Sequence, residues 1–146
     1  MKLFNQKQLA MTLTALGAIP LVLGGLLVVA DANLALLPAE PALVLHTYAA
    51  IIAGFVAGMH WGIHFCKRTN DSVYLLSSVC ALLLWVSFLW AGQKIGFALV
   101  LLTFAVLWFE EFRLSKQRVT TVWFWQIRNM VSAVAIFSLL LAIYGS

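Results

Sequence analysis

Three histidines are the first residues of this chain whose type and spacing could support chemistry. His46, His60 and His64 fall on one stripe of a single helix when successive residues are placed 100° apart. Ala53 and Ala57 lie between them on the same stripe. The opposite side of that helix, which we expect to face outward, carries Ile52, Val56, Met59 and Ile63. A neutral imidazole in this position can bond a neighbouring helix, hold a metal or contact a ligand.

Metal and haem sites need more ligands than this stripe provides. His60 and His64 have the i, i+4 spacing of a zinc metallopeptidase helix, but Trp61 stands where the catalytic glutamate would be. Cys66 and Cys80 are possible further ligands, although single cysteines are more typical of apolar packing. A haem would need methionine, cysteine or a second copy of the chain for its other axial ligand. The sequence therefore predicts no metal site, and hydrogen bonds to neighbouring helices or water explain the histidines equally well.

Arg128 is the one unambiguous charge well inside an apolar segment. Its depth is roughly 10–14 Å from the start of that segment, at 1.5 Å per residue. Three interpretations stay open. The side chain snorkels to lipid phosphates, or it bonds helix carbonyls, Gln126, Glu110 or Glu111, or it contacts an anion, a quinone-like carbonyl or a partner protein. His60 lies at about the same depth, so His60, Trp61 and Arg128 are candidate ligand-binding residues.

Small residues form a second pattern on the histidine-bearing helix. Ala50, Gly54, Gly58 and Gly62 recur at four-residue spacing. Such a stripe lets another helix approach closely, which drives association in a membrane, where lipid supplies no hydrophobic force between helices. We expect these four residues to form a helix-packing face, against a helix of this chain or of a second copy.

The elements that position these residues follow from composition. The 146 residues are 64% hydrophobic and only 10% charged, with a mean hydropathy of +1.01. Too few charges are present to cover a soluble domain, and nine scattered Lys and Arg form no nucleic-acid-binding face. We predict an all-α membrane protein, a single domain over 1–146. Its five transmembrane helices are expected at about 9–30, 42–66, 72–91, 95–109 and 119–144, none containing Asp or Glu.

Lys and Arg are distributed asymmetrically between the predicted connections. One side carries Lys2, Lys7, Lys67, Arg68, Arg113, Lys116 and Arg118, and the other carries only Lys94. The positive-inside rule then places the N-terminus in the cytoplasm and the C-terminus on the opposite side. The first apolar segment is long for a signal peptide and contains Pro20, so we expect it to be retained. The absence of an Arg- and Ser-rich transit peptide favours a bacterial inner (plasma) membrane.

The function expected from these residues is not enzymatic. The chain lacks a phosphate-binding glycine loop, a nucleophile elbow and a carboxylate pair at membrane depth. We expect an accessory or assembly subunit of a membrane complex, with other membrane subunits or a second copy as partners. The alternative is a protein that binds a membrane-soluble ligand near the cytoplasmic leaflet, such as a quinone, a haem or a lipid headgroup. The cofactor itself is not identified by the sequence.

Three segments resemble a known family. They are Leu16-Gly17-Ala18-Ile19-Pro20, the stretch from Tyr48 to Gly62 that ends Gly58-Met59-His60-Trp61-Gly62, and Trp125-x-x-Arg128. They are similar to the domain of unknown function 3429, which includes the transmembrane protein 69-like proteins. The resemblance covers nearly the whole chain and implies five spans. It highlights Gly17, Pro20, Tyr48, Gly58, His60, Trp61, Gly62 and Arg128, and it implies no particular activity.

Overall fold

The computed structural model describes residues 6–32, 39–67 and 71–145, and five α-helices account for most of them. The helices are α1 (Gln6–Val29), α2 (Pro41–Lys67), α3 (Asp71–Ser87), α4 (Lys94–Lys116) and α5 (Val122–Gly145). A 3₁₀ turn, η1 (Phe88–Trp90), continues α3. Five segments are long and apolar enough to cross a membrane, the third being Ser72–Trp90. The predicted number and order of the helices are confirmed.

Local sequence explains where the helices begin and end. Pro41 occupies the first position of α2, where its missing N–H costs no hydrogen bond. Gly92 has a φ of 76° in the turn before α4, a backbone conformation that side chains other than glycine rarely adopt. The fourth helix continues beyond residue 109, where the predicted fourth span ends. The helix runs to Lys116 because charged residues end an apolar segment without ending a helix.

Extension of α4 overturns the expectation that the spans contain no carboxylate. Glu110 and Glu111 both lie in α4, and both are buried. Arg113 donates from Nη1 to Glu110 Oε2 at 3.0 Å, one turn along the same helix. The Lys116 ammonium lies 4.5 Å from the centre of the Phe112 ring. These contacts hold the last turns of α4 in helical form.

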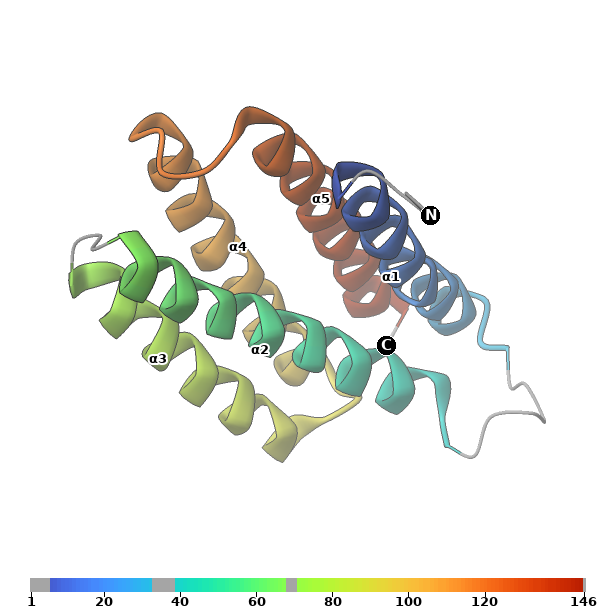
Figure 1. The fold of residues 1–146 in the computed structure, drawn as a ribbon. Coiled ribbons are helices and arrows are strands. Elements are labelled where there is room, and N and C mark those ends of the chain that lie inside the picture. Colours follow the sequence, from blue (N-terminus) through green and yellow to red (C-terminus); the bar gives the residue numbers. More distant parts are fainter. Residues whose placement is uncertain (1–5, 33–38, 68–70, 146) are drawn as a thin grey trace.

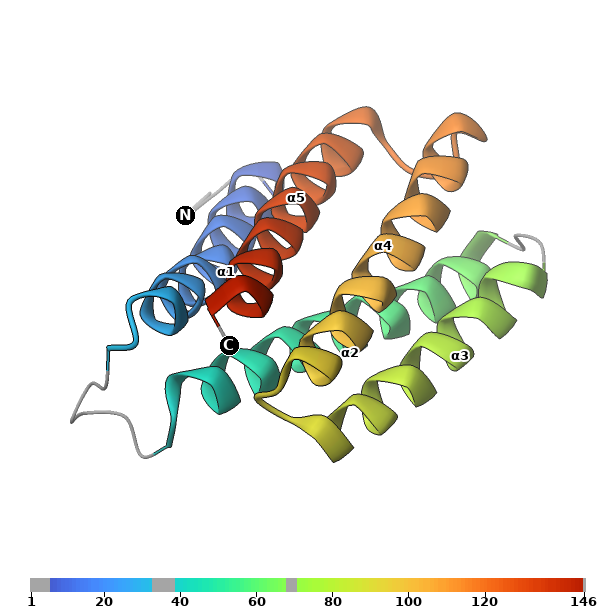
Figure 2. The same cartoon turned by 180° about the vertical axis from the view of Figure 1, so that it is seen from behind.

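Consecutive helices run in opposite directions, so α1 and α5 run in the same direction side by side (Figures 1 and 2). The helices α1 and α4 each pack against both α2 and α5. In both views α2 and α5 move apart toward the end of the bundle where α5 begins. The space between α2 and α5 therefore differs from one end of the bundle to the other.

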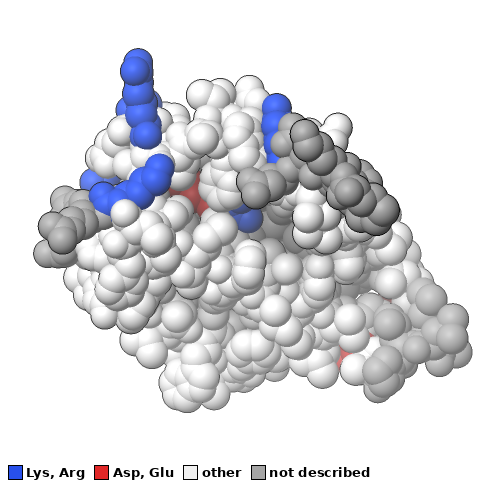
Figure 3. All heavy atoms as spheres, in the orientation of Figure 1, with Lys and Arg blue, Asp and Glu red and all other residues white. Residues whose placement is uncertain are grey.

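Basic side chains gather at that same end, which we call the basic end. Its described members lie at the start of α1, the end of α2, the end of α4 and the connection that follows, and they are Lys7, Lys67, Arg113, Lys116 and Arg118. Figure 3 shows Lys and Arg over one end and a largely uncharged side. Lys94 lies at the opposite end, as predicted. Two predicted members, Lys2 and Arg68, lie outside the described residues.

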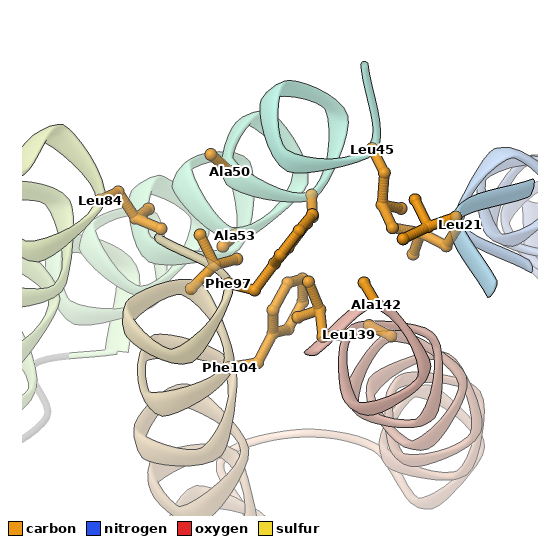
Figure 4. Packing of buried hydrophobic residues seen from close by; sticks show 13 residues of the cluster. Leu21, Leu45, Ala50, Ala53, Leu84, Phe97, Phe104, Leu139 and Ala142 are labelled. Carbon is orange, nitrogen blue, oxygen red and sulfur yellow. The ribbon is translucent and has the colours of Figure 1, made fainter. Parts of the chain in front are cut away.

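Aromatic side chains of α4 fill the middle of the bundle. Phe97 and Phe104 point into the space between α2 and α5 (Figure 4). Leu21 of α1, Leu45 of α2 and Leu139 of α5 close around them, and all five side chains are buried. This packing occupies the half of the bundle away from the basic end.

The closest helix approach uses glycines other than the predicted stripe. A Cβ atom on Gly25 of α1 would lie 3.1 Å from the carbonyl oxygen of Ser138 in α5. One on Gly145 would lie 2.9 Å from the Cα of Val29. The α1–α5 pair therefore depends on glycine to bring the two backbones together.

The predicted packing face on α2 is only partly used within the chain. Ala50 is buried, and a Cβ on Gly54 would lie 3.8 Å from Leu84 Cδ1 of α3. Around Gly58 and Gly62 a Cβ would meet nothing within 4 Å. A step of four residues turns about 40° around a helix, so the stripe winds from α3 to the outer surface. Packing of the last two glycines inside this chain is therefore not observed.

Candidate functional site

Arg128 of α5 forms an ion pair with Glu111 of α4. Arg128 Nε donates to Glu111 Oε1 at 2.9 Å, and the two residues are only 8% and 5% exposed. The continuation of α4 beyond residue 109 brings Glu111 beside α5. Of the three interpretations of Arg128, pairing with the Glu110–Glu111 segment is confirmed.

The ion pair uses only some of the hydrogen-bonding atoms of Arg128 and Glu111. A guanidinium has five N–H donors, and only the one on Nε bonds Glu111. Glu111 Oε2 is buried and accepts no hydrogen bond from the described residues. No nitrogen of Arg128 is both buried and without a hydrogen-bond partner. No hydrogen bond of the other four donors is seen among the described residues, and Arg128 lines a space beside the helix.

That space is a groove open to the side of the bundle, which we call the lateral groove. It has a volume of about 300 Å³ and lies between α1, α2 and α5. Its lining residues are Ala10, Leu13, Thr14, Gly17, Ile52, Phe55, Arg128 and Val131. Thr14 donates its hydroxyl hydrogen to the carbonyl of Ala10. Among the described residues of this lining, Arg128 is the single charged one, and most of the others are apolar.

A second, much smaller hollow lies on the other side of Arg128. Its volume is about 10 Å³, the size of one water molecule. It lies between α2, α4 and α5 and is lined by residues that include Ile63, Glu111 and Trp125. Lys67 Nζ donates to the carbonyl of Val119 and thereby ties the end of α2 to the α4–α5 connection. The basic end is therefore held together above the ion pair.

His60 and Trp61 do not join Arg128 in one site. His60 is fully buried, and its Nδ1 lies 2.9 Å from the carbonyl oxygen of Val56. Because a carbonyl only accepts, Nδ1 is the donor and Nε2 lacks a partner among the described residues. Trp61, 37% exposed, packs against Tyr74 of α3 with 4.2 Å between ring centroids. Neither residue is among the lining residues of the lateral groove, so the structure does not bring the three candidates together there.

The histidine stripe faces the bundle interior as predicted. His46 packs edge-on against Phe88 and Phe97, and both intervening alanines are buried. Val56 was expected on the outer side but is buried near Cys80 and Leu107. Within residues 6–32, 39–67 and 71–145, no three His, Cys, Asp or Glu side chains come together to hold a metal ion.

Residues 6–144 match the family model described as "Protein of unknown function (DUF3429)". The chain belongs to this family. No curated protein and no solved structure matches it.

Two of the residues that carried the DUF3429 resemblance have a packing role. The Tyr48 hydroxyl of α2 donates to the carbonyl of Gly17 in α1 at 2.8 Å. Pro20 lies inside α1 and has no N–H, so the carbonyl of Leu16 loses its helical donor. The carbonyl of Gly17, which accepts the bond from Tyr48, is next to that of Leu16. The Tyr48 bond therefore lies in the turn where Pro20 interrupts the backbone hydrogen bonds of the helix. Donors from adjacent helices make such prolines tolerable in a membrane.

The DUF3429 chain also has a polar contact that the sequence analysis missed. Trp108 Nε1 donates to Asn129 Oδ1 at 2.6 Å, which links α4 to α5. The Trp108 ring also lies beside Phe112 and Trp125. Asn129 follows Arg128 directly in the sequence. Adjacent residues point about 100° apart on a helix, and Asn129 therefore serves a different contact.

Proposed function

We propose that this protein is a non-enzymatic membrane protein that binds a membrane-soluble amphiphile in the lateral groove. The observation that carries the proposal is Arg128, a buried cation that Glu111 bonds at Nε and that lines a largely apolar groove. Ligand sites are typically apolar hollows with a few well-placed polar groups. A groove open to the side gives access from within the bilayer.

The structure favours this over haem or a His60-dependent ligand. A guanidinium supplies hydrogen-bond donors and positive charge but no lone pair for a metal ion. His60, the one candidate that could have ligated iron, is fully buried, and its Nδ1 bonds the carbonyl of Val56 in its own helix. The head of the ligand must therefore accept hydrogen bonds.

The proposal is tested by identifying what copurifies with the protein in mild detergent. We expect one compound at about one copy per chain in the organic extract. The double variant Arg128→Gln/Glu111→Gln removes the ion pair without leaving one charge unpaired, and it should lose that compound. The control Arg113→Gln/Glu110→Gln removes the other Arg–Glu pair of α4, outside the groove lining. Equal retention by all three proteins would refute the proposal.

A second candidate function is that of an accessory or assembly subunit. The observation that favours it is the outward position of Gly58 and Gly62, where an added Cβ meets nothing within 4 Å. The occupant that fits is a spanning helix of another membrane protein, since small residues permit close helix contact. Gly58→Leu should then abolish copurification of that partner while leaving the melting temperature of the isolated chain unchanged. A monodisperse wild-type chain that copurifies with no other protein would contradict it.

We also propose that the basic end lies in the cytoplasm of a bacterial cell, with the bundle in the plasma membrane. The support is the gathering of Lys and Arg at one end of the bundle. Single cysteines at Gln117 and at Ala32, in a chain with both native cysteines replaced, should react with an impermeant maleimide from opposite sides. Labelling of Gln117→Cys in intact spheroplasts would overturn the orientation.

A further inference from the structure

The shape, depth and charge of the lateral groove restrict the chemical class of its ligand further. We infer that its occupant is an anionic phospholipid, with the phosphate bonded to the terminal N–H groups of Arg128 and one acyl chain along the groove. This inference rests on the proposed ligand-binding function and names the ligand class of the same site.

The first step is the direction of the free donors. Glu111 bonds Arg128 through Nε alone, at 2.9 Å, so the edge formed by the two terminal NH₂ groups is left for another partner. That edge has the fork geometry that matches two oxygens of a phosphate. The guanidinium is held in place by the ion pair, and a ligand therefore meets donors that are already oriented.

The second step is charge. The described residues at the basic end comprise Lys7, Lys67, Arg113, Lys116, Arg118 and Arg128, against Asp71, Glu110 and Glu111. Six positive and three negative residues leave a net charge of +3 at this end. Glu111 lies on the Nε side of the guanidinium, so an anion at the terminal edge meets the positive group first. An anionic headgroup is thus favoured over a zwitterionic one.

The third step is depth. Ala10 lies four residues after the start of α1 and Ile52 fifteen residues before the end of α2. At 1.5 Å per residue, the groove reaches from roughly 6 to roughly 22 Å below the basic end. Half of a bilayer's hydrocarbon core is about 15 Å thick, so the groove has the extent of one leaflet. Arg128, six residues into α5 and roughly 9 Å deep, lies in the outer part of that range.

The fourth step is the lining that runs inward from Arg128. Gly17, Ile52, Phe55 and Val131 offer no charged group there, which suits an acyl chain and excludes a second polar head. Gly17 leaves room in the wall, because a Cβ there would meet only the Tyr48 hydroxyl, at 3.8 Å. The polar and apolar parts of the groove are therefore arranged like the two parts of a lipid.

Native mass spectrometry of the full chain tests the inference. The delipidated protein is offered an equal mixture of phosphatidylglycerol and phosphatidylcholine with matched acyl chains. We expect one phosphatidylglycerol per chain. The Arg128→Gln/Glu111→Gln variant should retain it at least about tenfold less well, because charge-assisted hydrogen bonds are lost. Arg113→Gln/Glu110→Gln should stay within about twofold of wild type, because screened charges outside the groove contribute little.

A pair of tryptophan variants tests the acyl-chain part without changing charge. Ala10→Trp puts a large ring into the groove lining, whereas Ala15→Trp adds the same ring to an exposed position of α1 outside that lining. We expect Ala10→Trp to lose the lipid and Ala15→Trp to keep it. Melting temperatures of all variants in the same detergent establish that they are folded. Equal retention by the two tryptophan variants would overturn the placement of the chain.

The outcomes separate this inference from the proposed function. Competition by millimolar inorganic phosphate that displaces the lipid would show that the phosphate alone is recognised, and it would contradict a lipid site. A stoichiometric neutral ligand, lost from Arg128→Gln/Glu111→Gln but with no preference for phosphatidylglycerol, would overturn the inference and leave the proposed function standing. Identical retention of every compound by wild type and both double variants would overturn both.

Discussion

Gly96→Ala is the substitution for which the structure gives the sharpest expectation. Gly96 lies in the first turn of α4, and a Cβ there would overlap the carbonyl oxygen of Trp90 and lie 2.9 Å from its carbonyl carbon. That carbonyl accepts a hydrogen bond from the backbone N–H of Gln93 at 3.0 Å, so the turn holds it in place. On the other side, the same Cβ would lie 3.1 Å from His46 Nε2. Neither neighbour is the flexible end of a long side chain.

The magnitude follows from comparing this site with an open one. Forcing an extra methyl group into a packed interior costs about 1–3 kcal/mol. Gly58→Ala adds the same atom where nothing lies within 4 Å, and it gains up to about 1 kcal/mol of helix propensity. The free energies of unfolding of the two variants should therefore differ by about 2–4 kcal/mol, with Gly96→Ala the less stable.

Unfolding in mixed micelles, followed by circular dichroism during a titration with sodium dodecyl sulfate, measures this difference. Wild type, Gly96→Ala and Gly58→Ala are compared in the same detergent and at the same protein concentration. Gly96→Ala should unfold at a lower fraction of dodecyl sulfate than wild type, and Gly58→Ala at an equal or higher fraction. A Gly96→Ala protein as stable as wild type would show that the approach of α4 to the preceding turn is looser than described.

Three further expectations follow from the contacts. Tyr48→Phe removes the hydrogen bond to α1 and should lower the free energy of unfolding by about 0.5–1.5 kcal/mol in the same titration; no change would mean that the bond contributes nothing. Arg128→Gln and Glu111→Gln should each cost about 3–5 kcal/mol because one buried charge is left unpaired, whereas the double variant should cost less than either; additive losses would rule out the coupling. A maleimide should label exposed Cys66 in the folded protein and buried Cys80 only after denaturation, as shown by peptide mass spectrometry; rapid labelling of Cys80 would contradict its burial.

The helices were predictable because membrane spans are apolar on all sides. Predicted and observed starts of α2 differ by one residue, from 42 to Pro41. The end of α4 was missed by seven residues, from 109 to Lys116, because hydropathy reports where a helix leaves hydrocarbon and not where its backbone stops being helical. The missed turns contain Glu111, the partner of Arg128. The sequence had already named Glu111 among the possible partners of Arg128, and a search for good helix formers beyond the apolar segment would also have extended the helix to it.

The depth of the candidate residues along their helices was predictable, but the direction in which their side chains point was not. Counting residues put His60 and Arg128 at a common level, but sequence does not show how helices are rotated against one another. His60 is buried and bonds the carbonyl of Val56 in its own helix, whereas Arg128 lines the groove beside α1. The glycine stripe shows the same limit, since its spacing indicates a smooth surface but not whether a helix of this chain or of a second copy covers it. Gly25, which does bring two helices together, belongs to no comparable repeat.

The side-by-side packing of α1 and α5 has a consequence for biosynthesis. The helix α1 leaves the ribosome well before α5, because their contact joins Gly25 to Ser138, more than a hundred residues later. While the chain is being made, α2, α3 and α4 can pair with neighbours in sequence, but α1 waits in the bilayer without its main partner. A truncation before α5 therefore leaves the Gly25 face of α1 bare, open to other nascent helices and to the proteases that remove unassembled membrane proteins. Completion of the last helix is what converts a set of inserted segments into a closed bundle.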